Sequence, residues 1–75
     1  MKIGETKSAS FKRLASRRTN HVIKNLRLIG NLSNKNNYKY SEDDFKKIFL
    51  NIETELRLSK SRFLVSLNKR SRFKI

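Results

Sequence analysis

Apolar residues recur at helical spacing in two stretches of the chain. Within each stretch they are mostly three, four or seven positions apart, which is the period of one helix face. The two patterns predict helices over residues 10–29 and 42–67. The apolar positions are Phe11, Leu14, Ala15, Val22, Leu26 and Ile29 in the first stretch, and Phe45, Ile48, Phe49, Ile52, Leu56 and Phe63 in the second.

Polar residues separate these stretches and predict a loop over residues 30–40. Four of these residues are Asn and one is Ser, whose side chains favour turns because they hydrogen-bond to nearby backbone groups. Gly30 follows the last periodic residue, where a left-handed C-cap is expected. Ser8 or Ser10 can cap the start of the first helix. Together these features predict an all-α fold with a long Asn-rich loop.

Ser41 marks the expected start of the second helix. Its hydroxyl can accept the backbone N–H near Asp44, and the Asp44 carboxylate can reach back to Ser41. Tyr40 and Phe45 occupy the two positions of a hydrophobic staple. The acids at 42–44 match the positive end of the helix dipole. We therefore interpret these acids as capping groups and not as a magnesium site.

The two apolar stripes predict an antiparallel two-helix hairpin with basic N- and C-terminal extensions. We expect one helical hairpin domain over residues 1–68 and a basic tail over residues 69–75. A hairpin buries only one seam, and a chain of 75 residues buries little surface. We therefore expect a homodimer, or docking onto a larger protein or ribonucleoprotein assembly. A partner would also bury the leucines that lie outside the two apolar stripes, which are Leu28, Leu50, Leu58, Leu64 and Leu67.

Positive charge dominates the composition. The chain has 19 Lys and Arg against 6 Asp and Glu, a formal net charge of +13. A compact fold with this charge repels itself, so we expect an anionic partner. Residues 1–30 and 59–75 are strongly basic, whereas residues 41–58 hold more acids than bases. We expect nucleic acid as that partner, in preference to an anionic membrane surface or an acidic protein.

Cations on one face of the first helix form the main candidate site. Four of them are spaced by four, seven and three positions, so they share a face: Arg13, Arg17, Lys24 and Arg27. Arg suits phosphate because its planar fork donates two parallel hydrogen bonds. A solvated helix face is the plain alternative, but no acid between Lys7 and Tyr40 balances these cations. The candidate phosphate-binding residues of this helix are Lys12, Arg13, Arg17, Arg18, Lys24 and Arg27.

Two further segments carry candidate cations. The loop places Lys35 and Lys39 beside Tyr38, groups that could contact RNA, although a plain turn explains them equally well. The tail at 69–75 could follow phosphates and place Phe73 against a base, the alternative being a solubilising disordered end. The candidate residues of the tail are Lys69, Arg70, Arg72 and Lys74.

Sequence motifs for catalysis or cofactor binding are missing. The chain has no Cys, one His (His21) and two Gly, so disulfides, thiolate metal sites and Gly-rich phosphate loops are excluded. We expect no enzyme, no cofactor and no metal. No apolar run approaches the roughly 18 residues of a membrane span. Residues 1–30 resemble a transit peptide in composition, but they carry half of the apolar pattern. We therefore expect a cytoplasmic protein or one of an organelle interior.

These features lead to three functional hypotheses. The preferred one is a non-enzymatic binder of structured RNA, such as a ribosomal or other ribonucleoprotein component. A DNA-binding accessory protein of a phage, plasmid or transposon is the second. The third is a small protein-binding regulator or inhibitor of a nucleic-acid enzyme, with the acids at 42–44 and the outlying leucines as its contact surface.

Overall fold

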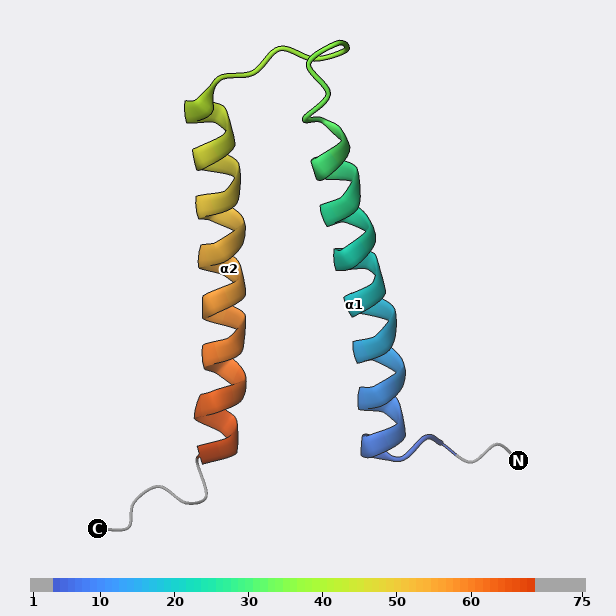
Figure 1. The fold of residues 1–75 in the computed structure, drawn as a ribbon. Helices are drawn as coiled ribbons and strands as arrows, with labels where there is room; N and C mark the ends of the chain where they lie inside the picture. Colours follow the sequence, from blue (N-terminus) through green and yellow to red (C-terminus); the bar gives the residue numbers. More distant parts are fainter. Residues whose placement is uncertain (1–3, 69–75) are drawn as a thin grey trace. The chain divides into compact units, whose positions relative to one another are not determined.

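The computed structural model describes residues 4–68, and this range contains two α-helices and no strand. Helix α1 is Lys7–Asn31 and helix α2 is Glu42–Asn68 (Figure 1). The chain divides into two units, Met1–Lys39 and Tyr40–Ile75, each with one of the helices. The predicted all-α class is confirmed for the part of the chain that the structure describes.

The start of α1 differs from the prediction. Thr6 is the N-cap, with an extended backbone (φ −71°, ψ 165°), and its hydroxyl oxygen accepts the backbone N–H of Ala9 at 3.0 Å. The prediction that Ser8 or Ser10 caps this helix is wrong, since both lie inside it. Thr6 caps as Ser would, because its hydroxyl satisfies one of the free N–H groups of the first turn. The earlier cap lengthens the helix at its start.

The end of α1 also differs from the prediction. Gly30 is helical, and the C-cap is Leu32 with right-handed backbone angles (φ −71°, ψ −7°). The prediction of a left-handed cap at Gly30 is therefore wrong. The last turn tightens instead: Leu32 and Ser33 donate to the carbonyls of Ile29 and Gly30 at 3.0 and 3.1 Å. These bonds satisfy terminal carbonyls without a positive φ.

Residues 32–41 connect the helices without helix or strand, and Asn34 organises the turn within them. Its carbonyl accepts the N–H groups of Asn37 and Tyr38 at 3.1 and 3.0 Å. Its side-chain oxygen accepts the N–H of Asn36 at 2.9 Å, which is an Asx turn. The amide oxygen of Asn34 therefore has a structural role.

The start of α2 agrees with the prediction. The Ser41 hydroxyl accepts the N–H of Asp44 at 3.0 Å, and the Asp44 carboxylate accepts the N–H of Ser41 at 2.9 Å. This is a reciprocal capping box. The rings of Phe45 and Phe49 lie 5.3 Å apart one turn later. The staple between Tyr40 and Phe45 stays a prediction.

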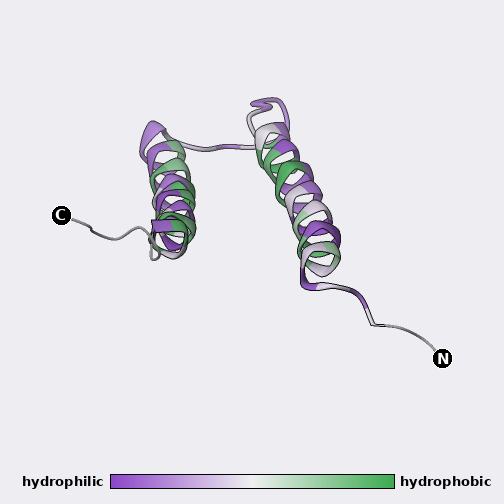
Figure 2. Cartoon of the chain, turned by 90° about the horizontal axis from the view of Figure 1, so that it is seen from below, coloured by the Kyte–Doolittle hydropathy of each residue, from purple (hydrophilic) through white to green (hydrophobic). Residues whose placement is uncertain are grey.

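Each helix has one predominantly apolar side. Figure 2 shows hydrophobic and hydrophilic residues alternating along both ribbons. No residue from 4 to 68 is buried, and large apolar side chains such as Leu26, Ile48 and Phe63 are more than a third exposed. Helices with so much exposed apolar surface depend on further packing for stability. The partly covered residues are Ser10, Leu14, Ala15, Ile29, Tyr40, Phe49, Ile52 and Thr54.

Candidate nucleic-acid interface

Four cations of α1 project from one side of the helix, as predicted from their spacing. We call Arg13, Arg17, Lys24 and Arg27 the basic face. At the rotation of an α-helix they fall within a sector of about 80°, on the side opposite the apolar stripe. The helix is regular throughout this stretch, so the four positions keep a fixed order along about 21 Å of its axis.

The other candidate cations do not all belong to this face. Arg18 lies seven residues after Phe11 and four after Leu14, which places it on the apolar side of α1. Lys12 lies between the two sides. Lys35 and Lys39 belong to the connecting segment. All eight candidates within residues 4–68 are exposed, and Lys69, Arg70, Arg72 and Lys74 lie outside the described residues.

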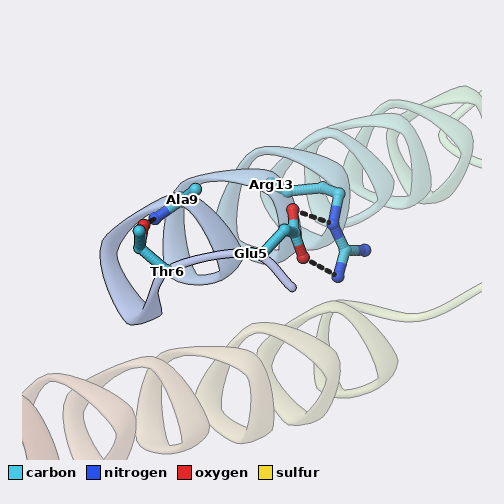
Figure 3. A network of polar contacts seen from close by, with 4 residues as sticks. All are labelled: Glu5, Thr6, Ala9 and Arg13. Carbon is cyan, nitrogen blue, oxygen red and sulfur yellow. Dashed lines mark hydrogen bonds and ion pairs between the residues drawn. The ribbon is translucent and has the colours of Figure 1, made fainter. Parts of the chain in front are cut away.

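Arg13 is paired with Glu5, a contact that helical spacing does not predict. Its Nε donates to one oxygen of the Glu5 carboxylate and its Nη2 to the other, both at 2.9 Å (Figure 3). These hydrogen bonds, followed by charge attraction, raise the pKa of Arg13, and the hydrogen bond to Arg13 lowers the pKa of Glu5. One cation of the basic face is therefore neutralised by the chain itself.

The spacing of residues 5 and 13 hid this pair from sequence reasoning. Eight positions is not a pairing distance within a helix, where charges three or four apart meet. Glu5 reaches Arg13 because it precedes the Thr6 cap, outside the helix, where the extended backbone lets its side chain turn back. The available signal was an acid directly before a capping Thr.

The remaining cations of the basic face have no acidic partner among residues 4–68. Ion pairs in this range join Arg13 to Glu5, Lys46 to Glu42 and Lys47 to Asp43, with none at Arg17, Lys24 or Arg27. Like charges on one helix face repel each other, most strongly Lys24 and Arg27, which lie three positions apart. An array of anions with comparable spacing would relieve that repulsion.

The connecting segment offers one exposed ring. Tyr38 is 49% exposed, and Lys35 and Lys39 beside it are also exposed. An exposed aromatic ring next to cations can stack on an unpaired base. The Asx turn uses one of the two acceptor positions of the Asn34 side-chain oxygen.

The acids at the start of α2 have separate partners. Asp44 caps the helix, and the backbone N–H of Ser41 and then its hydroxyl lower the pKa of this carboxyl. The Nζ of Lys46 lies 3.6 Å from Oε2 of Glu42, and the Nζ of Lys47 lies 3.9 Å from Oδ2 of Asp43. Residues 4–68 contain no group of three or more His, Asp or Glu side chains placed so that they could hold a metal ion. Neither helix, within the described residues, has the continuous apolar stretch that a membrane-spanning helix needs.

Comparison with protein-family models, with curated proteins and with solved structures finds no match to this chain.

Proposed function

We propose that this protein is a non-enzymatic nucleic-acid-binding protein and that the basic face of α1 contacts the phosphate backbone. The observation that supports this most strongly is that Arg17, Lys24 and Arg27 are exposed, share one face and have no acidic partner within residues 4–68. With Arg13 they extend over about 21 Å, enough to follow several successive phosphates.

Electrostatics supports phosphate as the ligand of this face. Each phosphate contact releases condensed counterions from the nucleic acid, which gives a favourable term that weakens with salt. Arg17 and Arg27 can each donate two parallel hydrogen bonds to one phosphate, whereas Lys24 supplies a compact charge. The net charge of +13 adds long-range attraction to the polyanion.

In this proposal the two helices form an antiparallel hairpin that leaves the basic face free. Both apolar stripes span 19 residues, Phe11 to Ile29 and Phe45 to Phe63, about 27 Å each. In antiparallel packing with Ile29 opposite Phe45, both stripes stay in register. The remaining opposed pairs are Leu26 with Ile48, Val22 with Ile52, Arg18 with Leu56, Ala15 with Ser59, and Phe11 with Phe63.

Structured RNA is the preferred ligand class, in the cytoplasm or an organelle interior. The exposed Tyr38 between two lysines of the connecting segment supports this preference, since proteins that read unpaired RNA bases stack them on such rings. Duplex DNA is the alternative, and it would use the basic face alone. The basic tail at 69–75 is proposed, on sequence alone, to add phosphate contacts.

Binding of the full chain to two labelled probes of equal length tests the proposal. An RNA hairpin with an unpaired loop should bind more tightly than a DNA duplex, and Tyr38→Ala should reduce only the RNA affinity. Equal affinity for both probes, unchanged in the Tyr38→Ala variant, would favour the DNA alternative. Failure to bind either probe would contradict the proposed function.

A further inference from the structure

The Glu5–Arg13 pair lies at one end of the basic face and imitates the contact expected for phosphate. A guanidinium fork donates two parallel hydrogen bonds to an oxyanion, and Glu5 accepts both at 2.9 Å. Figure 3 shows the third guanidinium nitrogen directed away from Glu5. A phosphate bound at that remaining edge would approach the Glu5 carboxylate, and two anions on one cation repel each other.

We propose that Glu5 is an intramolecular competitor of the nucleic-acid backbone for Arg13, so that the free protein holds this cation neutralised and phosphate displaces the carboxylate on binding. This inference rests on the proposed function. It adds that Glu5 controls whether Arg13, within the same site, is available to phosphate. Glu5 is suited to release, because it lies outside α1, before the Thr6 cap.

The exposure of the pair makes the exchange feasible. The side chains of Arg13 and Glu5 are 53% and 42% exposed, so water and salt weaken their attraction. The Thr6 cap uses its own hydroxyl and the N–H of Ala9, so releasing Glu5 leaves the capping hydrogen bond intact. Displacement thus removes one exposed ion pair and leaves the helix start in place.

Equilibrium binding of the full chain to a fluorescein-labelled RNA hairpin at low salt tests this inference. Glu5→Gln removes the negative charge but keeps the side-chain length. Because exposed ion pairs are weak, we expect its affinity to rise about twofold to fivefold. Glu53→Gln is the matched control, since it makes the same charge change on α2 at a residue with no ion pair among residues 4–68.

The double variant separates the local pair from general charge. In an Arg13→Gln background, Glu5→Gln should have no more effect than Glu53→Gln, since the cation for which Glu5 competes is gone. A gain in affinity that persists without Arg13, or that Glu53→Gln reproduces, would overturn the inference. A fall in affinity on Glu5→Gln would also overturn it, because Glu5 would then position Arg13 for the ligand.

The same measurements distinguish this inference from the proposed function. If the protein binds RNA and loses affinity when Arg17, Lys24 and Arg27 are replaced by Gln, the basic face is the binding site whatever Glu5 does. An unchanged affinity of Glu5→Gln would then overturn the competitor role alone. If the natural protein fails to bind the probe, both the function and the competitor role are contradicted.

Discussion

The Asp44 carboxylate accepts the backbone N–H of Ser41 at 2.9 Å, and the Ser41 hydroxyl accepts the backbone N–H of Asp44 at 3.0 Å. Because each residue satisfies the other's N–H, the first turn of α2 depends on both. Ser41→Ala is expected to lower the free energy of unfolding by about 1 kcal/mol, the usual effect of losing an N-cap. Chemical denaturation followed by circular dichroism measures the loss. Ser61→Ala, inside α2, is the control and should cost little, since Ala is a good helix former.

The same capping box predicts a dependence on pH. Hydrogen bonding from Ser41 lowers the pKa of Asp44 relative to an unstructured carboxyl. The stabilisation is therefore complete above the ordinary carboxyl pKa and is lost as the pH falls through the lowered value. A carbon-detected NMR titration of Asp44 should give a midpoint below that of an Asp in an unstructured peptide. A midpoint at or above that of the unstructured peptide would contradict the capping geometry.

The change in stability caused by Gly30→Ala tests whether Gly30 is part of α1 or forms a left-handed cap at its end. Gly30 lies in the helix, and a Cβ there would meet nothing within 4 Å outside its own helix segment. Gly30→Ala should therefore raise helical content and stabilise the protein by up to about 1 kcal/mol. Gly4→Ala, before the helix, should change little. Destabilisation by Gly30→Ala in thermal unfolding would indicate a left-handed cap after all.

The proposed hairpin can be tested by a disulfide, because the chain has no cysteine of its own. Ala15→Cys with Ser59→Cys places thiols at two small residues that oppose each other in the proposed register. Mild oxidation should give a monomer with an internal disulfide, detected by intact mass. Ser16→Cys with Ser59→Cys is the control, because Ser16 lies outside the apolar stripe. Equal cross-linking in both variants, or covalent dimers alone, would contradict the hairpin.

Local sequence signals predicted the helices better than their ends. Strong apolar periodicity located both helices, and Ser41 with Asp44 located the start of α2, because those groups act within one turn. The predicted left-handed cap at Gly30 was wrong because glycine favours such a cap without requiring one. The last turn of α1 closes through other backbone hydrogen bonds. The cap at Thr6 was missed because Ser8 and Ser10 offered the same chemistry two and four positions later.

The arrangement of the cations on α1 was predicted in part. Helical rotation alone placed Arg13, Arg17, Lys24 and Arg27 on one face, and it also places Arg18 on the apolar side. The pairing of Arg13 was not predicted, since it depends on the backbone direction before the cap and not on helical spacing. Glu5 lies just before the helix, where its side chain follows no helical period.

The salt dependence of RNA binding by the basic face is the decisive measurement. The affinity of the full chain for a labelled RNA hairpin should fall steeply as salt rises. Replacing Arg17, Lys24 and Arg27 by Gln should reduce the log–log slope by about 0.7 to 0.9 for each lost phosphate contact. The control variant has Gln in place of Arg57, Lys60 and Arg62. It removes an equal charge from α2, where these three residues do not share a face. We predict a smaller change for that control. A slope near zero, or equal slopes for both triple variants, would contradict a phosphate-binding face on α1.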